Sequence, residues 1–170
     1  MGRLLYVLRH AKSSWDDPAL SDHDRPLAPR GRKAAKAIAR HLRKEGVEPQ
    51  LVLCSPARRA RETLERIEPA LARRGVKVED ALYGAGADAL LGRLHDVGDA
   101  VASVMVIGHN PGLEDLVLAV ARPGARRDEV AVKFPTAALA TLAFDGTRWA
   151  DLAPGGADLV AYVRPRDLKR

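Results

Sequence analysis

Residues 4–10 read LLYVLRH and residues 104–109 read VMVIGH. Each stretch is a short apolar run that ends in a histidine, His10 or His109, and buried parallel strands have this pattern. Both imidazoles are therefore expected at the carboxyl ends of neighbouring strands. Open α/β sheets build their functional sites at that edge, because loops leave the sheet there and helix N-termini point back towards it. The two histidines are the first indication of function.

The alternation of apolar runs and amphipathic stretches predicts an α/β fold. Strands are expected at about residues 3–9, 51–54, 76–79 and 102–107, and helices at about 31–45, 56–74, 88–97 and 111–121. After a basic turn at 123–128, residues 130–163 should be rich in strands, with a hairpin of 137–144 and 148–152 that turns at Asp145-Gly146. This order predicts a three-layer α/β/α sandwich with a mostly parallel sheet and an antiparallel C-terminal edge.

The composition indicates a single domain over residues 1–170. The hydrophobic content of 46% can fill a substantial core. Cys54 is the one cysteine, and it lies in an apolar run, which excludes a disulfide framework and a cysteine zinc site. We expect a cytoplasmic protein, since no stretch has the pattern of a signal peptide or a membrane span.

The net charge of +6 raises the question of nucleic-acid binding. Many of the cations fall on the outer face of the helix predicted at 31–45, where basic side chains are usually solvated. Aromatic residues make up 4% of the chain, which is too few for a base-stacking platform. We therefore expect neither a nucleic-acid partner nor a membrane partner.

Two strand ends are followed by sequences that suit an anion-binding helix N-terminus. Ser55-Pro56 and Asn110-Pro111 each place a capping residue before a proline, which is favoured at the first position of a helix. Free N–H groups and the helix dipole at such an end favour phosphate. Arg9 and Arg59 would add positive charge to the same pocket, because a guanidinium can bind two phosphoryl oxygens.

A histidine in such a pocket can act as the nucleophile in phosphoryl transfer, a reaction that mainly needs alignment and charge stabilisation. The attacking imidazole must be neutral, and we expect nearby guanidinium charges to lower its pKa. Its other ring nitrogen should donate a hydrogen bond to a backbone carbonyl, which fixes the tautomer. His10 fits this role, with His109 as a second group for the phosphoryl oxygens.

The chain carries three ordered motifs: Arg9-His10-Ala11, the stretch from Ser55 to Thr63, and Gly108-His109-Asn110-Pro111. Together with Arg25-Pro26-Leu27 and Gly31, they resemble the histidine phosphatase superfamily, and in particular its SixA-type phosphohistidine phosphatases. The resemblance spans nearly the whole sequence. It implies that His10 becomes phosphorylated and that Arg9, Arg59 and His109 contact the phosphoryl group. It also suggests Arg25 as an additional substrate contact.

The segment after Val78 bears on the substrate. Superfamily members that cleave phosphate esters usually have a glutamate there as general acid, and the candidates in this chain are Glu79, Asp80 and Asp88. An alkoxide leaving group needs such an acid, whereas imidazole leaves readily because the pKa of its conjugate acid is about 6.5. A missing acid would thus be tolerable for P–N cleavage and costly for P–O cleavage.

The principal hypothesis is a phosphatase that acts on phosphohistidine in proteins and uses no cofactor and no metal. No two histidines have the spacing of zinc ligands, which disfavours a metal site. One alternative is a phosphomonoesterase for a small phosphate ester, which would use one of the three acids. Another is a non-catalytic binder of phosphorylated or nucleic-acid partners.

Several other side chains have a structural interpretation at this stage. Those expected to be structural or solvated are His41, His95, Arg58 and Arg61. His23 is interpreted as a surface residue in the long loop 12–30, and Trp15 as either packed there or lining the entrance to the pocket. Thr136 is expected to begin a strand near the site.

Overall fold

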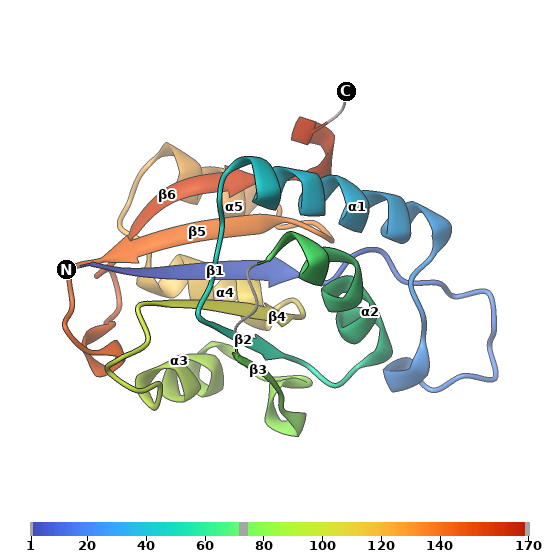
Figure 1. Ribbon diagram of the computed structural model, residues 1–170, viewed down its shortest axis with the longest axis horizontal. Coiled ribbons are helices and arrows are strands. Elements are labelled where there is room, and N and C mark those ends of the chain that lie inside the picture. Colours follow the sequence, from blue (N-terminus) through green and yellow to red (C-terminus); the bar gives the residue numbers. More distant parts are fainter. Residues whose placement is uncertain (1, 72–74, 169–170) are drawn as a thin grey trace.

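A six-stranded sheet forms the centre of the computed structural model, which describes residues 2–71 and 75–168 (Figure 1). In sheet order the strands are β3 (Gly75–Val78), β2 (Leu51–Cys54), β4 (Ser103–Gly108), β1 (Arg3–Arg9), β5 (Leu139–Phe144) and β6 (Asp158–Val163). The first four are parallel, and β5 runs antiparallel to both β1 and β6. The predicted mostly parallel sheet with an antiparallel C-terminal edge is confirmed.

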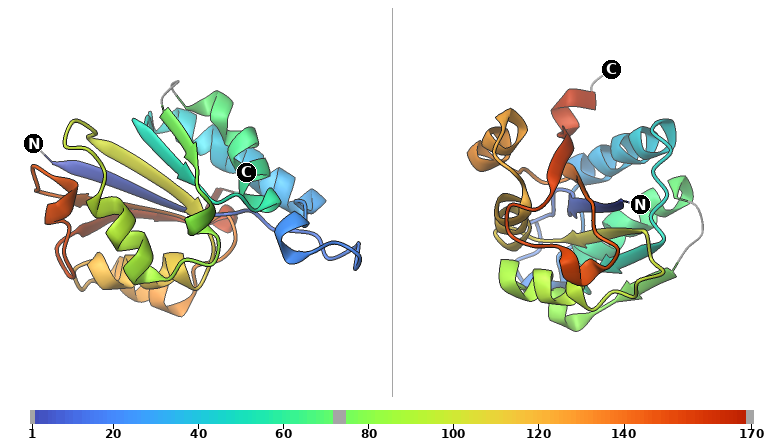
Figure 2. Two further views of the ribbon diagram at one scale, coloured as in Figure 1. Left: turned by 90° about the horizontal axis from the view of Figure 1, so that it is seen from below. Right: turned by 90° about the vertical axis from the view of Figure 1, so that its left-hand side faces the viewer.

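Helices cover both faces of this sheet (Figure 2, left). They are α1 (Pro29–Lys44), α2 (Arg58–Ile67), α3 (Ala87–His95), α4 (Gly112–Val120) and α5 (Ala125–Val132). α1 and α2 pack on one face, and α3, α4 and α5 lie on the other. Short 3₁₀ helices are found at Asp22–Asp24, Glu68–Ala70, Asp80–Leu82, Trp149–Asp151 and Pro165–Leu168. The arrangement is the predicted three-layer sandwich.

The apolar runs of the central strands are explained by burial on both faces. Along β4, Val104 and Val106 pack under α3 and α4, whereas Met105 and Ile107 pack under α1 and α2. Successive side chains of a strand point to opposite faces, so a strand with two covered faces must be apolar throughout. The first polar side chain after such a strand is free to enter a site at the edge of the sheet.

Two glycines let helices approach the loops that surround this edge. A Cβ on Gly31 of α1 would lie 2.0 Å from the carbonyl oxygen of Lys12, and one on Gly112 of α4 would lie 2.0 Å from that of Ala85. No side chain fits in either contact. The loop after β1 and the loop before α3 are therefore pressed directly against helix backbones.

The second predicted helix is too long. α2 ends at Ile67 and continues as the 3₁₀ helix Glu68–Ala70, because Pro69 has no N–H to donate to the preceding turn. The predicted last residues, 72–74, lie outside the described residues. The predicted basic turn and the strand-rich start at residue 130 are also wrong, since α5 occupies this stretch with Val130 buried. Its β-branched residues suggested a strand, but packing on α4 favours the helix.

The predicted hairpin is wrong in its second strand. Residues 149–151 form a 3₁₀ helix, in which the Asp151 carboxylate accepts a hydrogen bond from the Arg148 N–H at 3.2 Å. The Trp149 indole is fully buried and donates to the carbonyl of Val101 at 2.6 Å. β5 therefore pairs with β6, further along the chain.

Candidate active site

The carboxyl edge of the sheet brings His10 and His109 together. β1 and β4 are neighbours, with Arg9 in register with Gly108, so the residues that follow these two positions face each other. The two imidazole rings have centroids 5.1 Å apart and are tilted by 55°. The expectation of paired strand-end histidines thus agrees with the geometry.

His10 is buried, with 6% of its surface exposed, and its ring is held in one tautomer. Nδ1 lies 2.6 Å from the carbonyl oxygen of Ala11, so Nδ1 carries the proton and donates it. Nε2 keeps its lone pair and accepts a hydrogen bond from Nε of Arg59 at 3.3 Å. Burial, and then the charges of His109, Arg59 and Arg9, lower the pKa of His10 to about 3. The ring is neutral as predicted, although burial contributes more than the arginines.

The first turn of α2 positions Arg59. The Thr63 hydroxyl donates to the carbonyl of Arg59 at 2.8 Å and accepts the N–H of Ala11 at 3.0 Å, which ties the helix to the residue after His10. Arg59 Nη1 donates to the backbone oxygen of Asp22 at 2.6 Å, and Nη2 to its Oδ2 at 3.0 Å. The guanidinium therefore lies between the nucleophile candidate and a carboxylate.

His109 and Arg9 each have one unpaired side-chain nitrogen in the part of the chain that the structure describes. Nδ1 of His109 and Nε of Arg9 are buried and have no hydrogen-bond partner within the described ranges. Arg9 Nη1 donates to the carbonyl of Phe134 at 3.1 Å. Burial, and then the charge of Arg59, lower the pKa of His109 to about 4. Because buried polar atoms are nearly always paired in proteins, a ligand is the expected partner of these two nitrogens, and an anion suits the charged guanidinium of Arg9.

Of the two predicted capping side chains, Ser55 does not cap its helix, whereas Asn110 accepts a free N–H in the first turn of α4. α2 begins after Ala57, and the Ser55 hydroxyl accepts the Ala57 N–H at 3.2 Å while lying 2.7 Å from Nε2 of His109. Ser55 is therefore a partner of His109 and not the cap of the helix. α4 begins after Pro111, and Asn110 Oδ1 accepts the N–H of Glu114 at 3.2 Å. Proline precedes the first helical residue in both cases, so the predicted proline position is wrong.

Asp22 is a pocket residue that the sequence analysis missed. Besides Arg59, its carboxylate accepts hydrogen bonds from the Tyr83 hydroxyl at 2.6 Å and from Arg25 Nε at 3.2 Å. The bond from Tyr83, and then those from Arg59 and Arg25, lower the pKa of Asp22 to about 2. An ionised carboxylate thus faces the cationic pocket. The sequence offered one signal that Asp22 belongs to the pocket: it lies just before Arg25-Pro26-Leu27, a segment that resembles the family motif.

Arg25 uses its donors inside the loop. It donates to Ser13 Oγ at 2.7 Å and to Asp22, and its guanidinium lies 3.5 Å from the centre of the Trp15 ring. Trp15 itself is 73% exposed, so it packs on the outside of the loop. These contacts make Arg25 a support for Asp22, and its role as a direct substrate contact stays a prediction.

The segment after Val78 brings a tyrosine to the site. Tyr83 lies with its ring 5.5 Å from that of His109 and 5.0 Å from that of His23. Glu79 is held by two hydrogen bonds from Arg93, at 2.7 and 3.0 Å, which lower its pKa. Asp80 and Asp88 are exposed. Within residues 2–71 and 75–168, no hydrogen bond or ion pair links these three acids to either histidine.

The remaining predicted side chains take structural places. His95 lies 2.7 Å from the carbonyl of Leu152, and Arg58 pairs with Glu62 at 2.8 Å. Thr136 stands in a turn before β5 and does not begin the strand. In the described part of the chain, no cluster of three or more histidine, cysteine, aspartate or glutamate side chains could hold a metal ion. No helix there is long and apolar enough to cross a bilayer.

Comparisons with known proteins agree with this geometry. The model of the histidine phosphatase superfamily (branch 1) matches residues 5–100, which include Arg9, His10 and Arg59 but not His109. An uncharacterized protein of Mycobacterium tuberculosis is 38% identical over 94% of this chain and 100% of its own length. Phosphohistidine phosphatase SixA of Escherichia coli is 32% identical over 83% of this chain and 85% of its own. A solved structure from Nakamurella multipartitia, provisionally named SixA, has a TM-score of 0.86 at 34% identity and covers 97% of both chains.

Proposed function

Because this chain belongs to the histidine phosphatase superfamily, we propose that it hydrolyses phosphohistidine in proteins through a phosphorylated His10. The family makes it a phosphatase. The substrate and the roles of the individual residues are the content of the proposal. His10 is the nucleophile, and Arg9, Arg59 and His109 bind the phosphoryl oxygens.

The reaction has two steps. In the first, the lone pair of His10 Nε2 attacks phosphorus, and the P–N bond of the substrate breaks with its electron pair going to the leaving imidazole. A substrate ring that is already protonated departs as neutral imidazole. The phosphorylated His10 ring carries positive charge, and its Nδ1–H bond to Ala11 stabilises that charge. In the second step, water attacks phosphorus, His10 regains its electron pair, and phosphate and a proton are released.

The observation that supports this substrate concerns Glu79, Asp80 and Asp88: within residues 2–71 and 75–168, no hydrogen bond or ion pair links these acids to His10 or His109. The carboxyl of Asp22, which contacts the Arg59 guanidinium, has a pKa of about 2 and is ionised at neutral pH. Glu79 is paired with Arg93. An ester oxygen would need a proton from such a group as it leaves, whereas imidazole does not.

The test compares a phosphohistidine peptide with a phosphoserine peptide of otherwise identical sequence. We expect kcat/KM to be at least about a hundredfold higher for phosphohistidine, the low end of what a general acid contributes. A phosphoenzyme that is labile in acid should accumulate. His10→Ala should lower turnover by about ten-thousandfold, and its thermal unfolding should confirm that the variant folds.

Each other outcome contradicts the proposal in a different way. A preference for the phosphoserine peptide would favour the phosphomonoesterase alternative and would require a proton donor after Val78. Binding of inorganic phosphate without turnover of either peptide would favour a non-catalytic phosphate binder. Unchanged turnover in His10→Ala would remove His10 as the nucleophile.

A further inference from the structure

A basic groove lies beside the candidate active site, between α1 and the 3₁₀ helix Pro165–Leu168. Its volume is about 730 Å³. The cations that line it are Arg30, Lys33, Arg40, Lys133, Arg164 and Arg166. Arg164 pairs with Asp167 at 3.1 Å, whereas the other five are exposed and have no acidic partner within 4.0 Å in residues 2–71 and 75–168. The groove therefore carries a concentrated positive charge, and no acidic side chain among the described residues pairs with these five cations.

The groove and the active site share one turn of the chain. Pro135 and Thr136 line the groove, and the next N–H, that of Ala137, donates to the carbonyl oxygens of Arg9 and His10 at 3.1 and 3.0 Å. The sheet register gives the same placement, since Val163 pairs with Leu139, and Leu139 with Leu8. The groove thus opens at the edge of the sheet where His10 stands.

The groove also has an apolar part. Its lining includes Ala34 and Ala37 of α1 and Pro165 and Leu168 of the 3₁₀ helix, which are half-buried while five of the six cations are exposed, and it includes no aromatic ring. An apolar centre with a charged rim is the usual composition of a protein–protein interface. A single-stranded nucleic acid would instead need aromatic side chains on which its bases could stack. The chemistry therefore fits a protein surface with acidic side chains around a small apolar patch.

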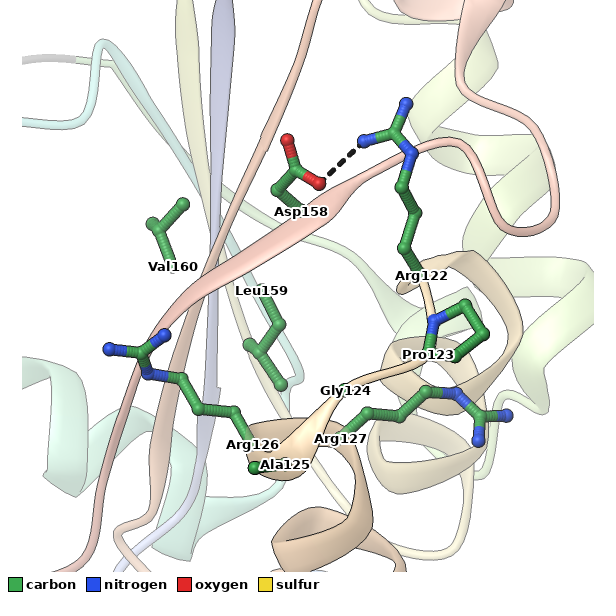
Figure 3. Close-up of a pocket in the computed structure, with 9 residues that line it drawn as sticks. All are labelled: Arg122, Pro123, Gly124, Ala125, Arg126, Arg127, Asp158, Leu159 and Val160. Carbon is green, nitrogen blue, oxygen red and sulfur yellow. Dashed lines mark hydrogen bonds and ion pairs between the residues drawn. The ribbon is translucent and has the colours of Figure 1, made fainter.

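A second basic hollow serves as a comparison, because it lies near the start of β1, at the end of that strand opposite His10. It has a volume of about 700 Å³ and is lined by Arg122, Arg126 and Arg127 together with Asp158 (Figure 3). Arg122 pairs with Asp158 at 2.7 Å, while Arg126 and Arg127 point away from each other. Asp158 is in register with Ala143, which pairs with Leu4 near the start of β1. This hollow is therefore remote from His10.

We propose that the groove beside α1 docks an acidic surface of the phosphorylated protein, so that the phosphohistidine of that protein reaches His10. The inference rests on the proposed function and adds that the phosphorylated protein has an acidic surface near its phosphohistidine. Docking by charge raises the local concentration of substrate and lowers KM without changing the chemical step. A small phosphate compound gains nothing from the groove.

The experiment uses two phosphohistidine peptides of equal length, one rich in glutamate and the other with glutamine in its place. At low salt, KM should be about tenfold lower for the acidic peptide, and the difference should shrink as salt is added. Lys33→Glu combined with Arg166→Glu should abolish this preference and leave kcat for phosphoimidazole unchanged. The matched control is Arg122→Glu combined with Arg126→Glu, which alters net charge equally and should keep the preference.

The outcomes separate the groove from the proposed function. Equal KM values for the two peptides in the unaltered protein overturn the docking surface, and so does an equal loss of preference in both double variants. Tighter binding of poly(U) than of the acidic peptide, if it is sensitive to Arg166→Glu, makes the groove a nucleic-acid site and also overturns the proposal. If no phosphohistidine compound is turned over, the proposed function fails. Fluorescence anisotropy with the acidic peptide then still tests the groove.

Discussion

The pocket has two walls of different construction. The histidine wall, made of His10, Arg59 and His109, comes from strand ends and the first turn of a helix, and His10 and Arg59 are buried. The loop wall, made of Asp22, His23 and Tyr83, comes from the loops before α1 and α3. The Asp22 side chain is 49% exposed, and side-chain hydrogen bonds join it to its neighbours. The comparison indicates that the candidate catalytic side chains lie on a rigid frame of buried strands and a helix. The residues through which a substrate would reach them are held more weakly, by side-chain hydrogen bonds between loops.

The two walls meet at Arg59. Its Nη1 and Nη2 donate to Asp22, whereas its Nε donates to His10. In the proposed mechanism, a phosphoryl group on His10 would bind the same guanidinium, because a planar fork binds two oxygens at once. Asp22 is thus an anion of the protein itself that occupies the Arg59 Nη1 and Nη2 donors, which a phosphoryl group would use. The following predictions test this division, from the largest expected effect to the smallest.

Arg59→Lys should damage the histidine wall most. A lysine keeps the positive charge but loses the fork that contacts both His10 and Asp22, so kcat/KM for phosphohistidine peptide should fall about a hundredfold. Arg58→Lys is the matched control, since Arg58 pairs with Glu62 at the surface, and its kcat/KM should stay within about twofold. Similar losses in the two variants would mean that the fork of Arg59 has no special role.

Acid should lower the free energy of unfolding through the two histidines of the histidine wall, and the loop wall should add little to this change. The pKa values of His10 and His109 are lowered to about 3 and about 4, whereas an unfolded histidine titrates at about 6.5. Between about pH 4 and 6.5 the unfolded chain binds protons that the folded protein does not, so the free energy of unfolding should rise with pH there and level off above. The two histidines together should contribute roughly 5 kcal/mol between pH 4.5 and 7.

Urea unfolding across this range measures that effect. Asp22 stays ionised throughout it, because its pKa is about 2, so the Asp22→Asn variant should keep the full pH dependence. The His10→Asn and His109→Asn double variant should lose most of it. An unaltered slope in the double variant would show that the histidines are not the source.

The two walls also differ in how far the sequence predicts them. His10, Arg9 and His109 follow directly from apolar runs, because this periodicity determines where strands end. Arg59 lies in the first turn of a helix, and the resemblance of the stretch from Ser55 to Thr63 to the superfamily distinguishes it from Arg58. Asp22 and Tyr83 lie in loops, whose paths depend on contacts distant in sequence, such as the approach of Gly31 to Lys12. Similarly, the parallel half of the sheet was predictable, whereas Val130 and Trp149 occupy helical segments because tertiary packing outweighs their local preference for strands.

Asp22→Asn gives the smallest and most informative change. The amide keeps the shape of the side chain and removes the anion that pairs with Arg59, so inorganic phosphate should inhibit more strongly, with its inhibition constant lowered about threefold. Asp24→Asn is the control, since Asp24 lies beside His23 at 3.6 Å, and its inhibition constant should not change. Weaker inhibition in Asp22→Asn would mean that Asp22 orients Arg59 for phosphate instead of competing with it. The loop wall would then belong to the rigid frame.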